Sequence, residues 1–348
     1  MPESSNSPAQ RRFGAGGPTL ADVGEVVLLD RLMEIAEEAS GAPRDGVGGD
    51  DAAVWTPRAS CDLAVSVDAL VEDVDFRRGW ITPRQLGRRA FAVAVSDLAG
   101  TGATPLHCLA TLCARGSEQL DDVVDIQRGL CEVAAEVGCA VAGGDVSSID
   151  GPMVIDVCVI GNLPRGRALR RSAGRPGDVL LVTGALGRAA AGLRLLLDND
   201  AAATEVEAGW IDAQLQPALR VAEGRLLLDA GVRCGGDISD GLLLDAARTA
   251  RACGCAAELW AESLPVDARL TERFGPQWLE LAIGGGEDFE LLVAVPEADA
   301  ARLVGDWPEG LAPLREVGRL RPGTGVRLLD RREGTEMTQP RTAAQHFA

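Results

Sequence analysis

Carboxylate residues recur at the ends of apolar segments, and small residues precede each of them in the sequence. The motifs are Gly48-Gly49-Asp50-Asp51, Ser66-Val67-Asp68, Ser96-Asp97, Gly143-Gly144-Asp145, Gly236-Asp237-Ile238-Ser239-Asp240-Gly241 and Gly284-Gly285-Gly286-Glu287-Asp288. A carboxylate among buried apolar residues is costly unless it is paired, hydrogen-bonded or bound to a metal ion. Any one motif is compatible with an ordinary turn or helix cap, but their recurrence favours a shared binding site.

The basic residues restrict the chemistry that these carboxylates can serve. The chain contains no lysine, so all 34 basic residues are arginine, and its two histidines are His107 and His346. A P-loop lysine, a protein-kinase lysine and a Schiff base are therefore excluded. His107 lies in the apolar run 106–112, which is typical of a core or edge-strand histidine. With only these two histidines, a catalytic triad that contains histidine is disfavoured.

Oxygen ligands without histidine or cysteine suit a hard cation such as Mg²⁺. Magnesium held by carboxylates usually completes its shell with substrate phosphates. Glycines beside such carboxylates allow backbone amides to approach the phosphates closely. The motifs therefore predict a site for ATP and several magnesium ions, with phosphate transferred to a small molecule.

Composition excludes other classes of partner. The net charge of −18 argues against a nucleic-acid surface, because the phosphates would be repelled. No apolar run reaches the roughly 18 residues that a membrane-spanning helix needs. Residues 1–18 lack the apolar stretch of a signal peptide, so we expect a disordered tail on a cytoplasmic protein. The nine cysteines include no Cys-x-x-Cys pair and are expected to be free thiols.

Apolar periodicity predicts helices and strands that alternate in both halves of the chain. A length of 348 residues suits two domains of about 150 residues each. The Pro-, Gly- and Arg-rich stretch 164–177 suggests the boundary, giving a tail over 1–18, an N-terminal domain over 19–168 and a C-terminal domain over 169–348. Helices are expected at 19–39, 83–99, 120–137, 186–197, 218–230 and 241–253, and strands at 63–71, 105–113, 139–142, 153–160, 178–183 and 289–295.

The motifs and their order resemble the thiamine-monophosphate kinase family over about residues 19–347. This family belongs to the ATP-binding superfamily of aminoimidazole ribonucleotide synthetase, selenophosphate synthetase and HypE. The resemblance implies an α/β (α+β) fold with two domains, in which a mixed-sheet N-terminal α/β domain forms a homodimer through its sheet and the C-terminal domain is α+β. It also implies ATP in a cleft, several Mg²⁺ ions on its phosphates, and direct in-line transfer of the γ-phosphoryl group to thiamine monophosphate.

The resemblance assigns roles to individual residues. It implies catalytic roles for Asp97 and Asp240, and substrate-side positions at Asp75 and Glu287. The matched metal ligands are Asp51, Ser66, Asp68, Asp97, Asp145, Asp237 and Asp240, and Asp50 is expected to support Asp51. The matched nucleotide-binding positions are Gly144, Asp145, Arg171 and Ser239.

Three positions depart from the family pattern. Asp75 stands where the family has a substrate-side histidine, Val67 stands where a hydroxyl residue precedes the motif aspartate, and Ala344 replaces an aromatic near the thiamine rings. One interpretation is drift within a thiamine-monophosphate kinase. Another is an ATP-dependent kinase or activating enzyme of the same superfamily with a different acceptor. A non-catalytic nucleotide-binding protein is the third, which the retained carboxylate motifs disfavour.

Overall fold

The computed structural model describes residues 12–14, 17–40, 56–200, 202, 204–340 and 342 of the chain. Its contacts divide the chain into two compact units. The first comprises residues 1–57, 67–94 and 106–159, and the second comprises residues 58–66, 95–105 and 160–348. Helices and strands mix in both, which confirms the predicted α/β (α+β) class.

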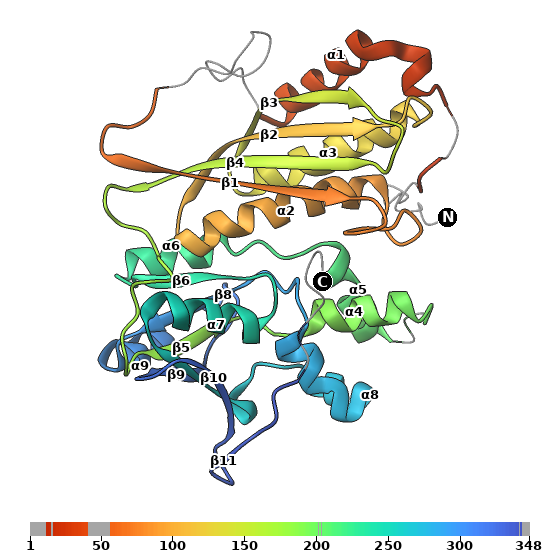
Figure 1. Cartoon of the computed structure of the whole chain (residues 1–348). Helices are drawn as coiled ribbons and strands as arrows, with labels where there is room; N and C mark the ends of the chain where they lie inside the picture. The colour runs from red at the N-terminus through yellow and green to blue at the C-terminus, as the bar shows by residue number, and fades with distance from the viewer. Residues whose placement is uncertain are drawn as a thin grey trace, which may run out of the picture. The chain divides into compact units, whose positions relative to one another are not determined.

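A four-stranded sheet forms the basis of the first unit, with strand order β1–β4–β2–β3. Strands β2 and β3 are parallel, with Thr111 opposite Asp145. In Figure 1, α2 and α3 lie along one face of this sheet, and α1 lies beside β3. The element bounds are α1 Leu20–Ser40, β1 Cys61–Val71, α2 Pro83–Thr101, β2 Thr104–Ala114, α3 Leu120–Glu136, β3 Ala140–Ser148 and β4 Val154–Pro164.

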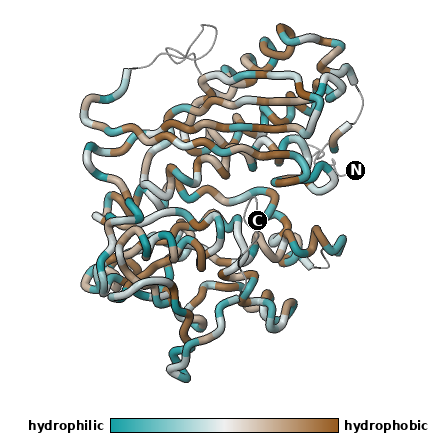
Figure 2. Tube along the Cα trace, viewed as in Figure 1, coloured by the Kyte–Doolittle hydropathy of each residue, from teal (hydrophilic) through white to brown (hydrophobic). Residues whose placement is uncertain are grey.

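Strand alternation decides which face of this sheet is covered. Successive side chains of a strand point to opposite faces, and on β4 every second residue is buried, including Ile155, Val157 and Val159. On β1 the alternation leaves Leu63 and Val67 exposed. Figure 2 shows the apolar residues that run along these strands. The sheet thus has one face packed against helices and one face that presents apolar side chains.

Helices α2 and α3 approach each other at two glycines. A Cβ atom added to Gly87 would lie 1.8 Å from the carbonyl oxygen of Ile126. A Cβ atom added to Gly129 would lie 1.9 Å from the carbonyl oxygen of Arg84. Because any larger residue would push the helices apart, this pair fixes their spacing under the sheet.

A seven-stranded sheet organises the second unit, in the order β11–β10–β7–β9–β5–β8–β6. Its pairs are antiparallel except β10 with β7. Every residue of β5 and β8 is buried, as expected for central strands covered on both faces. The strands are β5 Val179–Thr183, β6 Cys234–Ile238, β7 Ala256–Trp260, β8 Glu290–Val295, β9 Leu314–Arg321, β10 Gly325–Asp330 and β11 Thr335–Glu336.

Six α-helices of the described residues accompany this sheet: α4 Arg188–Leu197, α5 Glu205–Leu215, α6 Val221–Asp229, α7 Leu242–Cys253, α8 Ala268–Phe274 and α9 Glu297–Gly305. A π-helical turn covers Glu280–Gly284. Helix α7 follows β6 directly and packs on β6, β7 and β10. None of the helices in the described part of the chain is long and apolar enough to span a membrane.

Most predicted elements are present within a few residues of their predicted bounds. The prediction missed β6, whose sequence Cys-Gly-Gly-Asp-Ile is short and rich in glycine. It also predicted no element at β7, at α8 or at α5, the last of which begins at Glu205. The Thr204 hydroxyl accepts the N–H of Glu207 at 3.2 Å and caps this helix. All nine cysteines are free, as predicted.

Candidate functional site

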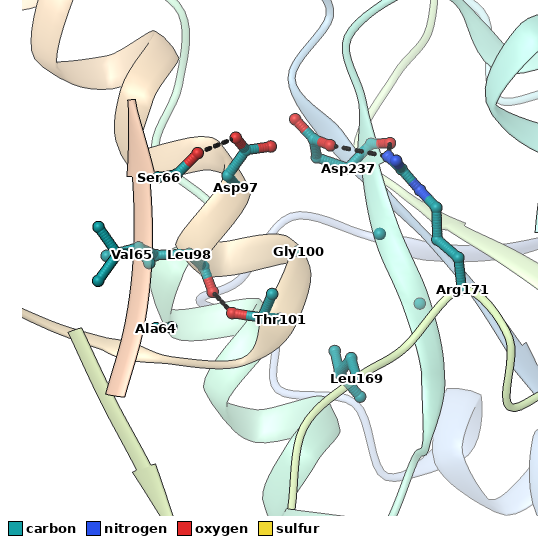
Figure 3. Close-up of a pocket in the computed structure, with 12 residues that line it drawn as sticks. Ala64, Val65, Ser66, Asp97, Leu98, Gly100, Thr101, Leu169, Arg171 and Asp237 are labelled. Carbon is teal, nitrogen blue, oxygen red and sulfur yellow. Dashed lines mark hydrogen bonds and ion pairs between the residues drawn. The ribbon is translucent and has the colours of Figure 1, made fainter. Parts of the chain in front are cut away.

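A cavity of about 300 Å³ in the second unit gathers four of the predicted site residues. Ser66 comes from β1, Asp97 from α2, Asp237 from β6, and Arg171 from the segment before β5 (Figure 3). The Ser66 hydroxyl donates a hydrogen bond to the Asp97 carboxylate. The other lining residues are Ala64, Val65, Leu98, Gly100, Thr101, Leu169, Gly235 and Gly236.

Two carboxylates face each other in this cavity. Figure 3 shows the carboxylates of Asp97 and Asp237 pointing toward one another. Asp237 is only 4% exposed and accepts a hydrogen bond from the Ser96 hydroxyl at 2.8 Å. Burial, followed by the negative charge of Asp97, raises the pKa of Asp237 to about 6. The pair therefore favours a cation or a hydrogen-bond donor between its members.

Arg171 partly neutralises this pair from the side of β6. Its Nη2 atom donates to the backbone oxygen and to Oδ1 of Asp237, both at 3.1 Å. Gly236 makes this approach possible, because an added Cβ atom would lie 2.5 Å from Nε of Arg171. Arg171 is 66 residues away from Asp237 in sequence, so motif spacing alone does not pair the two residues.

The loop after β6 carries Ser239 and Asp240. The Asp240 side chain is 45% exposed and is paired with Arg248. Both backbone N–H groups of the loop donate to Asp245, from Ser239 at 3.1 Å and from Asp240 at 3.0 Å. The Asp240 carboxylate is thus partly exposed beside Arg248, while Asp245 holds the backbone of the loop.

A second loop, residues 284–289, lies against the first and carries Glu287. The N–H of Glu287 donates to the carbonyl of Ser239 at 2.7 Å, and the N–H of Phe289 donates to Ile238 at 3.0 Å. A Cβ atom on Gly286 would lie 2.7 Å from the carbonyl oxygen of Ser239. This close backbone contact explains the glycine at position 286.

The second loop is also conformationally strained. Glu287 and Phe289 have φ angles of 69° and 49°, a backbone region that residues other than glycine rarely adopt. Asp288 between them accepts N–H groups of Gly187 at 2.8 Å and Ala189 at 3.4 Å, at the start of α4. Gln214 of α5 donates to the Glu287 carboxylate. Strain of this kind is typical of functional loops.

The first unit holds Asp68, Gly144 and Asp145. Asp68 is half-buried on β1, and Asp145 is exposed on β3. A Cβ atom on Gly144 would lie 1.9 Å from the carbonyl oxygen of Ala110. Because β1 and β3 are the two edge strands of the sheet, about 14 Å of sheet separates them. Asp68 and Asp145 cannot bind the same magnesium ion, whose ligands lie at about 2.1 Å.

Two of the three departures from the family pattern lie within the described residues. The Asp75 carboxylate accepts the N–H of Val71 at 2.8 Å and closes a turn after β1. Val67 is 57% exposed, and alternation along β1 directs it to the face opposite Ser66 and Asp68. A side chain at position 67 is therefore directed away from the face that carries Ser66 and Asp68.

Asp50, Asp51 and Ala344 lie outside the described residues. Asp245, Arg248 and Gln214 were not predicted and contact predicted site residues. Ser96 belongs to the predicted Ser96-Asp97 motif, but no role was assigned to it. Asp245 had a usable signal, since it is a carboxylate in the first turn of a helix that begins Leu-Leu-Leu. Arg248 gave no such signal before its partners were placed.

Comparisons with known proteins find matches that cover most of the chain. Two family models match: AIR synthase related protein, N-terminal domain, over residues 49–163, and AIR synthase related protein, C-terminal domain, over residues 175–331. The thiamine-monophosphate kinase of Bacillus subtilis (strain 168) is 32% identical over 301 residues, which cover 86% of this chain and 92% of the relative.

Two solved structures extend the comparison. The crystal structure of thiamine-monophosphate kinase from Stenotrophomonas maltophilia K279a is 31% identical, with a TM-score of 0.78, and the match covers 88% of this chain and 96% of that chain. The structure of AaThiL complexed with AMPPCP and TMP is 28% identical, with a TM-score of 0.72, and the match covers 94% of this chain and 98% of that chain.

Proposed function

Because the chain belongs to the thiamine-monophosphate kinase family, we propose that it transfers the γ-phosphoryl group of ATP to thiamine monophosphate, giving thiamine diphosphate. The observation that carries the proposal is the Asp97–Asp237 carboxylate pair, flanked by Arg171 in one cavity. Such an arrangement attracts cations and leaves an arginine for phosphate oxygens. Complexes of the relative AaThiL with AMPPCP and TMP support the same pair of ligand classes.

We propose Mg²⁺ as the metal cofactor on the chemistry of the donors. Ser66, Asp97 and Asp237 offer only oxygen atoms, and the charge of Asp97 already disfavours ionised Asp237. A divalent cation between them would remove that repulsion. Among the described residues, no three His, Cys, Asp or Glu side chains form a metal site by themselves, which fits ions that share their ligands with ATP phosphates. The remaining proposed ligands are Asp51, Asp68, Asp145 and Asp240.

The reaction requires positioning and charge neutralisation rather than a covalent nucleophile. Bound Mg²⁺ would supply most of the neutralisation. Arg171 would add a fixed positive charge, and we propose Asp97 and Asp240 as the catalytic carboxylates. Gly144 and Asp145 are proposed nucleotide-binding positions. The Ser239 hydroxyl is another, because its N–H and carbonyl groups already bind protein partners. Glu287 and Asp75 remain the proposed substrate-side residues.

An assay with two variants tests this function. Purified protein is incubated with ATP, Mg²⁺ and thiamine monophosphate, and ADP and thiamine diphosphate are separated by chromatography. Asp97→Asn and Asp240→Asn should each lower turnover by at least about 100-fold with little change in melting temperature. The matched control is Asp267→Asn, where a carboxylate caps α8 by accepting the N–H of Arg269 at 3.0 Å.

The outcomes separate the hypotheses. Thiamine diphosphate formed by the wild type and lost in both variants supports the proposal. Full activity in both variants would show that these carboxylates are structural caps. ADP formed only with another acceptor would replace thiamine monophosphate as the substrate and keep the ATP site. Absence of any ATP-binding heat in calorimetry would refute the enzymatic proposal.

We also propose that the enzyme is a cytoplasmic homodimer. The exposed sheet face supports the dimer, since Leu63, Val65 and Val67 are 49%, 63% and 57% exposed on one strand. The nine free cysteines support a reducing compartment. Light scattering should give twice the chain mass for the wild type and the chain mass for Leu63→Arg. Val304→Arg changes an exposed valine of α9 and should stay dimeric. A monomeric wild type would contradict the proposal.

A further inference from the structure

Asp245 is a buried carboxylate with four donors around it. It lies in the first turn of α7 and is fully buried. Oδ2 accepts the N–H of Ser239 at 3.1 Å and of Asp240 at 3.0 Å. The carboxylate therefore holds the backbone of the loop that carries the proposed catalytic Asp240. These amides have no helical partner, so without Asp245 they would be left to water or ligand.

The other oxygen of Asp245 lies between two arginines. Oδ1 accepts from Nη1 of Arg248 at 2.9 Å and lies 3.8 Å from Nη2 of Arg171. Each arginine also contacts a second carboxylate of the site. Arg248 donates to Asp240, and Arg171 donates to Asp237 at 3.1 Å. The charged side chains thus alternate in sign, and Asp245 is the central one. Their order is Asp237, Arg171, Asp245, Arg248 and Asp240.

We propose that Asp245 is a positioning residue for phosphoryl transfer, which holds the Asp240 loop by its amides and shares Arg171 and Arg248 with the two site carboxylates. The proposal rests on the proposed function, and it assigns no contact between Asp245 and a ligand. The negative charge of Asp245 offsets the positive charge of both arginines, so that Asp237 and Asp240 attract cations more strongly. Outer partners of this kind commonly change metal affinity or activity by about 10- to 100-fold.

Substitution by asparagine separates the two contributions of Asp245. In Asp245→Asn the side-chain oxygen can still accept the two loop N–H groups, because the residue keeps its shape. The amide nitrogen cannot accept from an arginine and would face Arg248 as a second donor. Arg248 would then pair with Asp240 alone, and Arg171 with Asp237 alone. Both site carboxylates would bind a cation more weakly.

The charge argument predicts effects of opposite sign. Asp245→Asn removes a negative charge and should weaken the binding of Mg²⁺ with AMPPCP about tenfold. Arg248→Gln removes a positive charge from Asp240 and should strengthen it. The double variant has the net charge of the wild type and should bind within about threefold of it. A purely structural role of Asp245 predicts instead that both single changes weaken binding and that the double variant is the worst.

The experiment is a calorimetric titration of full-length protein with AMPPCP at several Mg²⁺ concentrations, together with kcat and KM for ATP and the melting temperature. The control is again Asp267→Asn, which should bind like the wild type. Unchanged binding in Asp245→Asn, or weaker binding in Arg248→Gln, would overturn the proposal. Since the sign for Arg248→Gln is tested alone, failure of Asp245→Asn to fold leaves a decisive measurement.

The binding readout needs no acceptor, so the two proposals can fail separately. If the wild type binds AMPPCP with Mg²⁺ but does not phosphorylate thiamine monophosphate, the proposed acceptor is wrong and the role of Asp245 is still decided by the signs above. If turnover is normal and the signs agree with a structural role, only the inference about Asp245 is overturned. A wild type that binds no AMPPCP would overturn both.

Discussion

The variant Asp237→Asn tests whether the ionised carboxylate of Asp237 destabilises the folded protein when no cation is bound. Asp237 is 4% exposed, and its carboxylate faces that of Asp97. Burial and this neighbour raise the pKa of Asp237 from 3.8 to about 6 despite the hydrogen bond from Ser96. A raised carboxyl pKa means that the folded protein holds its proton more tightly than the unfolded chain does. Ionisation of Asp237 therefore destabilises the cation-free fold.

The direction and the size of the effect follow from these two pKa values. Below the unfolded value of 3.8 both states are protonated and Asp237 makes no pH-dependent contribution. As the pH rises from about 4 to about 6, the unfolded chain releases the proton first and the folded protein loses stability. A shift of about two units corresponds to about 3 kcal/mol, which is fully present above about pH 7. Between about pH 4.5 and pH 7.5 the change is about 2 kcal/mol.

The assay is urea unfolding of the wild type and Asp237→Asn in EDTA at four values between about pH 4.5 and pH 7.5. Groups that do not interact with Asp237 contribute equally to the two proteins, so their pH dependence cancels in the difference. The variant should gain about 2 kcal/mol relative to the wild type over this range. Saturating Mg²⁺ should reduce that gain at high pH, because a cation stabilises the ionised carboxylate. A difference that stays constant within about 0.5 kcal/mol would refute the reasoning.

Two further substitutions test the packing that supports the site. Gly144→Ala places a methyl group 1.9 Å from the carbonyl oxygen of Ala110, so strands β2 and β3 must separate. The free energy of thermal unfolding should fall by at least about 1–3 kcal/mol. Gly79→Ala is the control, because its added methyl group points into open space. Arg220→Lys replaces a fork that donates to both oxygens of buried Glu290 at 2.5 and 2.7 Å and should cost about 2–3 kcal/mol in urea unfolding; a loss below about 0.5 kcal/mol would show that lysine suffices.

Apolar runs explain why much of the fold was predictable. The strands at 178–183 and 289–295 are almost unbroken in apolar residues, and they became the buried central strands β5 and β8. Strand β6 lies at the edge of the same sheet, beside β8, and has five residues as β5 does, but two of them are glycine. Glycine lowers the strand propensity of β6, but Gly236 makes room for Arg171 in the site. Functional demands thus removed the signal by which β6 could have been recognised.

The predicted site residues divide by the kind of partner they use. Asp97 and Asp237 could be singled out as candidates because a carboxylate in an apolar context is anomalous by itself, and both line one cavity. Motif spacing was insufficient for Arg248 and Asp245, whose roles depend on backbone N–H groups and on each other. An arginine three residues after an aspartate on a helix is an ordinary surface pair in any sequence. Only the position of the Asp240 loop gives this pair its meaning.

The departures from the family pattern lose force once the local structure is considered. Asp75 suggested a changed acceptor, but its carboxylate accepts the N–H of Val71 while its own N–H donates to the Val71 carbonyl at 2.8 Å. Asp75 thus closes a turn in addition to its proposed substrate-side role. Val67 is explained by strand alternation, which directs any side chain at that position away from Ser66. Since both changes have causes within the chain itself, neither argues for a different acceptor, and thiamine monophosphate is the acceptor that the family relationship favours.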